Sequence, residues 1–208
     1  MSDGQILIAD DHPLFRQALC LAAARVAPRA ALIEAGTLAA AAEAAAGADA
    51  LRLILLDLKM PGAQGFSGVA LLHAERPEVP ILIVSSAEGL GVAQEARRFG
   101  AVGFVGKDAP LEAIEAAIAR ALAGEVVPSA PDPELDAVAE RVASLTPMQL
   151  KVLLGVLGGQ LNKQIAYDLA ISEATVKAHM TAILRKLDVG NRTQAVLAAR
   201  ALGLGVRH

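Results

Sequence analysis

Short aliphatic runs alternate with alanine-rich stretches along the first 124 residues. The runs are nearly free of charged side chains, which is typical of strands whose two faces are both covered. Each run is followed by a stretch of about 10 to 15 residues in which apolar positions have helical spacing. The five runs are Gln5 to Ala9, Ala31 to Glu34, Leu53 to Leu56, Ile81 to Val84 and Val102 to Val105. This alternation predicts an α/β domain with a five-stranded parallel sheet and helices on both of its faces.

In residues 144–208 the apolar positions have helical spacing throughout, and no strand-like aliphatic run is predicted. The segment Thr146 to Gln149 begins a helix, because threonine caps a helix, proline suits its first position and glutamine can reach back to the cap. Apolar residues continue to Leu157, where two glycines end the helix. A short second helix over Asn162 to Leu169 precedes a new cap at Ser172, and a last helix begins near Asn191. The pattern predicts an all-α domain of four helices that contains a helix-turn-helix.

The helix after Ser172 has one apolar face and one small, basic face. The apolar positions, spaced for one side of a helix, are Val176, Met180, Ile183, Leu184 and Leu187. The opposite side carries Lys177, Ala178, Thr181 and Arg185. On periodicity alone such a face is more often a solvated surface, although small and basic side chains also suit the major groove of duplex DNA.

The charge changes sign along the chain. Residues 1–124 have 10 basic and 14 acidic side chains, residues 125–143 have 1 and 5, and residues 144–208 have 8 and 3. The middle stretch also contains Pro128, Pro131 and Pro133. We therefore predict two domains, 1–124 and 144–208, joined by an acidic, proline-containing linker over 125–143 that is helical in part. The basic second domain is a candidate partner for a phosphate backbone.

Composition excludes several classes of protein and of site. The chain is 54% hydrophobic, which excludes a disordered chain, and only 2% aromatic, which leaves few rings for stacking single-stranded bases. No apolar run approaches the roughly 18 residues needed to span a bilayer, so we expect a cytoplasmic protein with no membrane partner. Cys20 is the one cysteine, which excludes an intrachain disulfide and a cysteine zinc cluster, and we expect it to pack in the core.

Polar side chains follow four of the five predicted strands. Asp10 and Asp11 follow the first strand, Asp57 the third, Ser85 the fourth and Lys107 the fifth. The carboxyl ends of parallel strands share one edge of the sheet, where ligands of such folds bind. Three carboxylates there repel one another unless a cation joins them, and Mg²⁺ with its preference for oxygen ligands suits them. Lysine and serine can hold phosphoryl oxygens, so the set indicates phosphoryl transfer onto a carboxylate.

Each of these residues also has a simpler interpretation. Asp and Ser at strand ends are common turn and cap residues, and Asp11 two positions before Pro13 is one candidate. The functional interpretation rests on the complete set, together with the tight turn at Pro61-Gly62 soon after Asp57.

With these residues in place, residues 1–124 resemble a response-regulator receiver domain, which implies a flavodoxin-like, doubly wound sheet. The resemblance implies that Asp57 is the phosphoacceptor, that Asp10 and Asp11 join it in binding Mg²⁺, and that Lys107 binds the phosphoryl group. It also implies that Ser85 is the switch hydroxyl, preferred to Ser86 because of its spacing from Asp57 and Lys107. The remaining implied roles fall on Phe104, as the aromatic switch residue, and on Lys59, as a position that tunes phosphate lifetime.

The second half resembles the LuxR-type DNA-binding domain, and the two halves together resemble a NarL/FixJ-type response regulator. The matching segments are Leu145-Thr-Pro, Asn162 to Ala166, Ser172 to Leu187 and Asn191-Arg192-Thr193. The implied partners are a sensor histidine kinase, double-stranded DNA and, after phosphorylation, a second copy of the chain through the last helix. The implied DNA-contacting residues are Lys163, Thr175, Lys177, Ala178, Thr181, Arg185 and Lys186.

Two positions depart from this pattern. Leu161 replaces a hydroxyl residue before Asn162, so we expect another cap, with Asn162 as the candidate. The start of the first helix, Met148-Gln149-Leu150, is more apolar than usual, and we expect it to expose extra apolar surface. His12 and His179 are not predicted as metal ligands, because neither has a second ligand at helical or turn spacing.

Two other functions remain open. An aspartate-dependent phosphohydrolase also uses an Asp nucleophile with Mg²⁺, but the residue two after Asp57 is Lys59 where such enzymes have a second acid. We therefore predict a protein that is not an enzyme. A constitutive DNA-binding protein whose receiver no longer takes phosphate is the second alternative.

Overall fold

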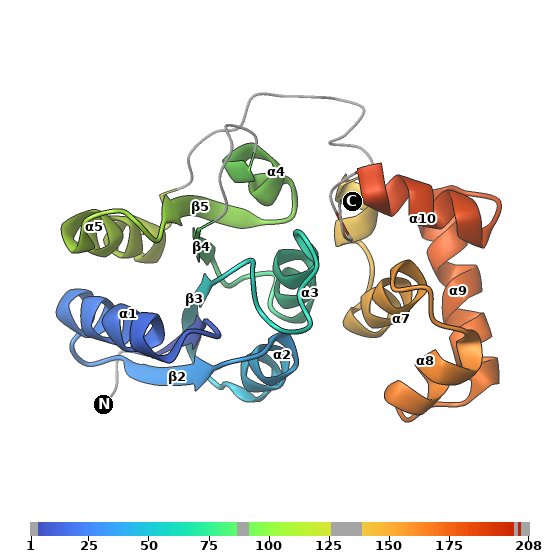
Figure 1. The fold of residues 1–208 in the computed structure, drawn as a ribbon, viewed down its shortest axis with the longest axis horizontal. Coiled ribbons are helices and arrows are strands. Elements are labelled where there is room, and N and C mark those ends of the chain that lie inside the picture. The colour runs from blue at the N-terminus through green and yellow to red at the C-terminus, as the bar shows by residue number, and fades with distance from the viewer. Residues whose placement is uncertain (1–3, 87–91, 126–138, 202–203, 205–208) are drawn as a thin grey trace. The chain divides into compact units, whose positions relative to one another are not determined.

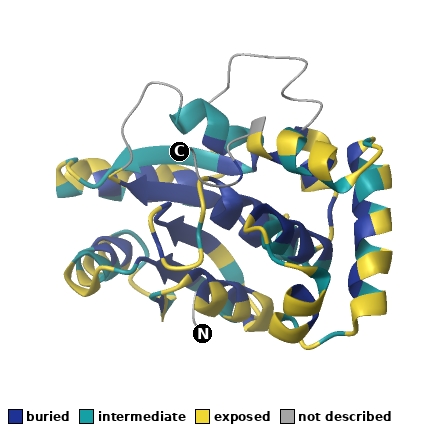
Figure 2. Ribbon diagram, turned by 45° about the vertical axis from the view of Figure 1, so that its right-hand side comes forward, coloured by how far each residue is buried: buried dark blue, intermediate teal, exposed yellow. Residues whose placement is uncertain are grey.

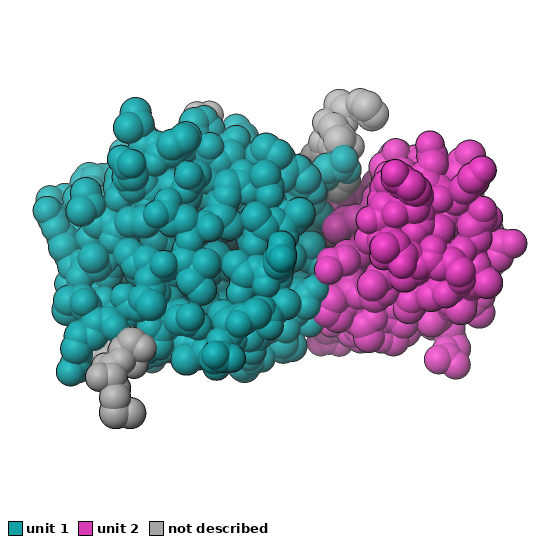
Figure 3. Space-filling model, turned by 90° about the horizontal axis from the view of Figure 1, so that it is seen from below, with its two compact units in different colours: residues 1–130 teal, residues 131–208 magenta. Residues whose placement is uncertain are grey.

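The computed structural model describes residues 4–86, 92–125, 139–201 and 204. The chain forms two compact units, residues 1–130 and 131–208 (Figure 3). Within the described residues, no helix combines the length and the apolar character needed to cross a bilayer.

The first unit contains a five-stranded parallel sheet in the order β2-β1-β3-β4-β5 (Figure 1). The strands are β1 (Gln5–Ala9), β2 (Ala31–Ala35), β3 (Leu51–Leu56), β4 (Ile81–Ser85) and β5 (Ala101–Gly106). The prediction for β3 began two residues late, because exposed Arg52 interrupts its aliphatic run. The strand order reverses between β1 and β3, which is where folds of this type place their ligands.

Helices cover both faces of the sheet, as predicted. They are α1 (Pro13–Val26), α2 (Leu38–Gly47), α3 (Ser67–Glu75), α4 (Val92–Arg98) and α5 (Leu111–Leu122). Figure 1 shows α1 and α5 on one face and α2, α3 and α4 on the other. In β1, Ile6 and Ile8 join the core beneath α1 and α5, while Leu7 between them is equally buried. Figure 2 shows the central strands of the sheet coloured as buried. Burial on both faces explains why the strands are almost wholly aliphatic.

Cys20 packs against the core under α1 and is half-buried. Burial and the nearby Glu34 carboxylate raise the pKa of its thiol, although Arg16 opposes them. Cys20 thus packs in the core as predicted, although its side chain is only partly buried.

The second unit is helical and centred on α9. Its helices are α7 (Pro147–Leu157), α8 (Asn162–Asp168), α9 (Glu173–Leu187) and α10 (Arg192–Ala201), and α9 packs against the other three. Thr146 and Gln149 form the predicted capping box at the start of α7. Ser172 Oγ accepts a hydrogen bond from Thr175 N–H and so caps α9. Val176, Met180, Ile183 and Leu187 are buried and Leu184 is half-buried, as the spacing predicted.

One expectation about this unit was wrong, and a second was wrong in part. Asn162 does not cap α8, because Leu161 is the cap residue, and Asn162 Oδ1 instead accepts a hydrogen bond of 3.1 Å from Arg192. The start of α7 exposes less apolar surface than expected, since Leu150 is buried and Gln149 is folded into the capping box, while Met148 is half-buried. Leu150 is covered because α7 packs against α9 and α10.

Most of the predicted linker, residues 126–138, lies outside the described residues. Residues 139–143 are helical and belong to the second unit. Ala139, Val142 and Leu145 are each at most 3% exposed, so they are part of its core. Arg141 lies at the end of α9, where its Nη1 donates to the Leu187 carbonyl at 3.3 Å and its Nη2 lies 3.7 Å from Asp188 Oδ2.

Candidate functional site

Four strands deliver polar side chains to the carboxyl edge of the sheet. Asp10 and Asp11 follow β1, Asp57 follows β3, Ser85 ends β4 and Lys107 follows β5. The Asp10, Asp57 and Ser85 side chains are buried, Lys107 is 13% exposed and Asp11 is 29% exposed. The fold thus brings together the whole set predicted from the strand ends.

Asp57 is the residue on which these groups converge. Ser85 Oγ donates to Asp57 Oδ1 at 2.7 Å, and the backbone N–H of Lys59 donates to the same oxygen at 3.1 Å. Lys107 Nζ donates to Asp57 Oδ2 at 2.8 Å. Burial by itself raises the pKa of Asp57, but these hydrogen bonds and the lysine charge outweigh it and hold the pKa below its ordinary value. Asp57 is therefore an ionised carboxylate, the form that can act as a nucleophile.

Lys107 joins two of the acids. Its Nζ lies 2.6 Å from Asp10 Oδ2 as well as 2.8 Å from Asp57, and it stands 4.8 Å from the centre of the Phe15 ring. Burial lowers the pKa of this ammonium, but the hydrogen bonds and charges of Asp10 and Asp57 outweigh burial and raise it. The lysine is a fixed positive charge beside the nucleophile.

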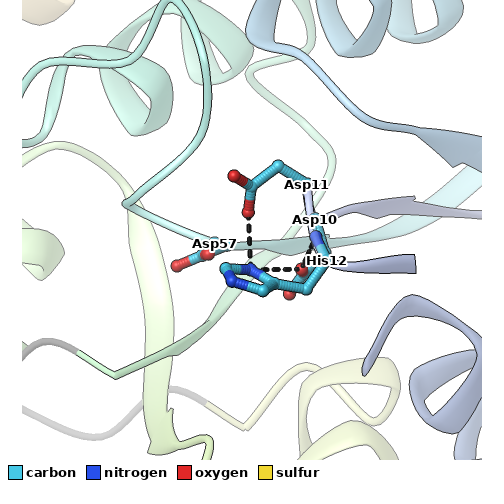
Figure 4. A group of neighbouring side chains, drawn as sticks. All are labelled: Asp10, Asp11, His12 and Asp57. Carbon is cyan, nitrogen blue, oxygen red and sulfur yellow. Dashed lines mark hydrogen bonds and ion pairs between the residues drawn. The ribbon is translucent and has the colours of Figure 1, made fainter. Parts of the chain in front are cut away.

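The acidic group also includes His12, which was not predicted as a metal ligand. One ligand atom from each of Asp10, Asp11, His12 and Asp57 lies within 4.8 Å of the others (Figure 4). The backbone N–H of His12 donates to Asp10 Oδ1 at 2.8 Å, and its Nδ1 lies 2.7 Å from Asp11 Oδ1. The exclusion of His12 was wrong about its surroundings, because its companions come from adjacent positions and from β3 rather than from helical spacing. The triplet Asp10-Asp11-His12 was the available signal.

The donor set fits a hard divalent cation. Asp10 Oδ2 lies 2.6 Å from Lys107 Nζ, and Asp11 Oδ1 lies 2.7 Å from His12 Nδ1. Three carboxylates therefore lie around the ammonium of Lys107, and an excess of negative charge of this kind favours binding of a further cation. The cluster can therefore bind a metal ion, with carboxylate oxygens of the kind that Mg²⁺ prefers.

The remaining predicted residues of the first unit lie around this cluster. Ser86 is exposed and lines an open cavity of about 470 Å³ with His12, Leu14 and Lys107, in contrast to buried Ser85. Phe104 is half-buried in β5, beside Ile83 of β4.

In the second unit, the predicted DNA-contacting residues differ in their surroundings. Lys163, Lys177, Ala178, Thr181 and Arg185 are exposed. Thr175 is half-buried and its hydroxyl lies 2.8 Å from that of Ser172. Lys186 is also half-buried, and its Nζ donates to the Ser144 carbonyl at 2.5 Å. Lys186 thus ties α9 to the segment before α7.

Comparison with known proteins agrees with both halves of the structure. Residues 6–119 match the response regulator receiver domain family, and residues 143–199 match the family of bacterial regulatory proteins of the luxR type. The chain is a NarL/FixJ-type response regulator. Its second unit is a DNA-binding domain, and the family consists of transcriptional regulators, which excludes the phosphohydrolase alternative.

Relatives of this response regulator share both domains. A glycerol metabolism activator from Pseudomonas putida is 42% identical, with 94% of each chain covered. The probable transcriptional regulatory protein NarL of Mycobacterium tuberculosis is 30% identical, covering 94% of this chain and 93% of the relative. The RcsB response regulator of Salmonella typhimurium shares the fold, with a TM-score of 0.54 at 20% identity over 97% of this chain and 100% of that one.

Proposed function

We propose that phosphorylation of Asp57 by a sensor histidine kinase controls dimerisation and sequence-specific DNA binding by this response regulator, and so regulates transcription. One observation carries the proposal: Asp57 is an ionised, buried carboxylate whose two oxygens are held by Ser85 and Lys107 beside two further acids. The Pseudomonas putida relative is named an activator, which favours activation over repression. Because the target is bacterial DNA, we place the protein in the cytoplasm.

The transfer forms one bond and breaks one. An oxygen of Asp57 attacks the phosphorus of a phosphohistidine, the new O–P bond forms, and the P–N bond breaks with its electron pair returning to the imidazole. Lys107 neutralises charge on the phosphoryl oxygens, and Ser85 donates to one of them. Asp10, Asp11 and Asp57 would hold Mg²⁺, which supplies further positive charge against the phosphoryl oxygens when bound.

Phosphorylation is proposed to act as a switch through Ser85 and Phe104. The phosphoryl group adds a charge of about −1.5 to −2 where Ser85 Oγ now donates to Asp57. Movement of Ser85 toward the phosphoryl oxygens opens space that half-buried Phe104 can enter from β5. The face of the receiver domain that includes β5 then shifts between two packings.

The kinase is proposed to dock on the start of α1. Leu14 is 82% exposed and lines a cavity together with Lys107, so an exposed apolar residue shares this cavity with the lysine of the site. Leu14→Ala is expected to slow phosphotransfer from the kinase severalfold and to leave phosphorylation by acetyl phosphate unchanged. Equal slowing with both donors contradicts docking at Leu14.

DNA recognition is proposed to come from the exposed face of α9, with Lys177, Ala178 and Thr181 toward the bases. Lys163 and Thr175 would contact phosphates, with Arg185 on the same exposed face of α9. Lys186, which the resemblance also implied as a phosphate contact, donates instead to the Ser144 carbonyl, so we do not propose it as one. We propose that α10 is the dimerisation surface and that two half-sites lie about one helical turn of DNA, or a multiple, apart. The proposed domains are 1–124 and 144–208, with the second domain extended back to residue 139 because Ala139 and Val142 belong to its core, and the acidic linker lies before that residue.

The deciding experiment compares wild type with Asp57→Asn. Phosphorylation by acetyl phosphate, sedimentation and operator binding are measured on both proteins with and without Mg²⁺. Wild type is expected to take up phosphate only with Mg²⁺ and then to dimerise and bind DNA more tightly, while Asp57→Asn gains nothing. A wild type that is phosphorylated but unchanged in assembly and affinity refutes the switch, and one that takes no phosphate supports the constitutive alternative.

A further inference from the structure

The His12 side chain lies beside the acids but has no role in the proposed phosphorylation chemistry. His12 is the cap residue of α1, yet its side chain caps nothing, and the imidazole is 70% exposed. Nδ1 lies 2.7 Å from Asp11 Oδ1 and 3.7 Å from Asp10 Oδ1, and Figure 4 shows the ring among the three carboxylates. A nitrogen and a carboxylate oxygen at 2.7 Å share either a proton or a metal ion.

These distances suit neighbouring ligands of one ion. With metal–ligand bonds of about 2.1 Å, adjacent ligands of an octahedral ion lie about 3 Å apart and opposite ones about 4.2 Å apart. The two nitrogen–oxygen distances bracket the adjacent value, and the whole group spans 4.8 Å. Small side-chain rotations therefore complete a single coordination sphere.

The charge at the same place also favours a cation. The Asp10 side chain is fully buried, and Lys107 Nζ lies 2.6 Å from its Oδ2 and 2.8 Å from Asp57 Oδ2, so one ammonium faces a group of three carboxylates. The backbone N–H of His12 donates to the other Asp10 oxygen at 2.8 Å, which fixes the histidine beside these acids.

We propose that His12 Nδ1 is a nitrogen ligand of the cation site, so that the site takes divalent first-row transition-metal ions more tightly than Mg²⁺. The inference rests on the proposed function, because it extends the carboxylate site at Asp57. Imidazole nitrogen favours Mn²⁺, Co²⁺, Ni²⁺ and Zn²⁺, whereas Mg²⁺ prefers oxygen and keeps its waters. His12 therefore sets which ions bind rather than whether a cation binds.

The test titrates full-length protein with Co²⁺ and with Mg²⁺ by calorimetry, and follows the visible Co²⁺ absorption. His12→Ala is expected to lower Co²⁺ affinity at least about tenfold, as losses of metal-site groups commonly do, and to change Mg²⁺ affinity less than about twofold. His12→Asn gives the same result while keeping a good helix cap. His179→Ala is the control, because it removes a histidine from the second unit, and it is expected to leave both affinities unchanged.

Each outcome has a separate meaning. Unchanged Co²⁺ binding and absorption in both His12 variants overturn the proposal. An equal loss of Co²⁺ and Mg²⁺ also overturns it, because His12 then acts by orienting the acids. Neither of these two outcomes affects the proposed function, as long as the wild type is phosphorylated in the presence of Mg²⁺. A wild type that binds no divalent ion and takes up no phosphate refutes the proposed function itself.

Discussion

Ser85 Oγ donates a hydrogen bond of 2.7 Å to Asp57 Oδ1, and both side chains are buried at the carboxyl ends of adjacent strands. The Ser85 hydroxyl keeps this hydrogen bond as long as Asp57 is not phosphorylated. A phosphoryl group on Asp57 offers the same hydroxyl more negatively charged oxygens as hydrogen-bond acceptors. Phosphorylation of Asp57 is therefore expected to change the hydrogen bond that Ser85 makes.

Ser85→Ala is expected to separate phosphorylation from its consequence. Asp57 keeps Lys107 and the Lys59 N–H, so phosphate uptake from acetyl phosphate persists. The gain in DNA affinity on phosphorylation is expected to disappear, as measured by operator binding. Ser86→Ala is the matched control, because Ser86 is exposed and has no bond to Asp57. A normal affinity gain in Ser85→Ala would show that the hydroxyl is not the switch.

Lys177→Ala and Lys186→Ala are expected to differ although both lysines lie on α9. Lys177 is exposed, and its loss lowers the salt slope of DNA binding by about 1 if it meets a phosphate, or costs about 1–3 kcal/mol at one base pair if it reads a base. Lys186 donates to the Ser144 carbonyl, so its loss lowers thermal stability and leaves the salt slope nearly unchanged. Binding titrations against salt and thermal unfolding distinguish the two; identical profiles contradict this assignment.

Leu161→Ser is expected to stabilise the second unit by about 0.5–1 kcal/mol. The cap position is extended, the leucine is 69% exposed, and Gln164 Oε1 already accepts from Leu161 N–H at 2.7 Å. A serine hydroxyl supplies the missing half of the capping box. Urea unfolding measures the gain, with Leu161→Ala as the control that removes the leucine without adding a hydroxyl. Equal stability of the two variants argues against capping.

Fragments beginning at 131 and at 144 are expected to differ in stability. The shorter fragment lacks buried Ala139 and Val142 and the Arg141 side chain at the carboxyl end of α9, where positive charge is favourable. We expect it to unfold at a lower urea concentration and to bind DNA more weakly, while still binding. Arg141→Ala in the longer fragment isolates the charge. Identical midpoints for both fragments would mean that residues 139–143 contribute no stability.

His73 is expected to make stability fall as the pH drops below about 6.5, the ordinary value for histidine. Its ring packs against Gly100, and burial lowers the pKa of the imidazole. Below this pH the His73 imidazole binds a proton in the unfolded chain but stays neutral in the folded chain, so acidification favours unfolding. His73→Gln should flatten the dependence of the urea midpoint on pH between 5 and 7, and an unchanged dependence in this variant would contradict the role of His73.

The sequence by itself determined the fold class and the chemistry at the strand ends. Aliphatic runs covered on both faces require a parallel sheet, and such a sheet collects its carboxyl ends at one edge, so Asp57 and Lys107 could be placed together although 50 residues separate them. Helix spacing likewise determined which face of α9 is buried. These features follow from periodicity, which depends only on residues within one element.

Only the tertiary structure decided which groups meet across elements. His12 meets Asp10 and Asp11 as neighbours in sequence, but Asp57 joins them because the end of β1 lies beside the end of β3, which no spacing along the chain encodes. Asn162 is held by Arg192 rather than capping its own helix, and Lys186 reaches Ser144 across 42 residues. A short polar side chain has several partners within hydrogen-bond reach, and the packing of distant elements decides which of them it takes.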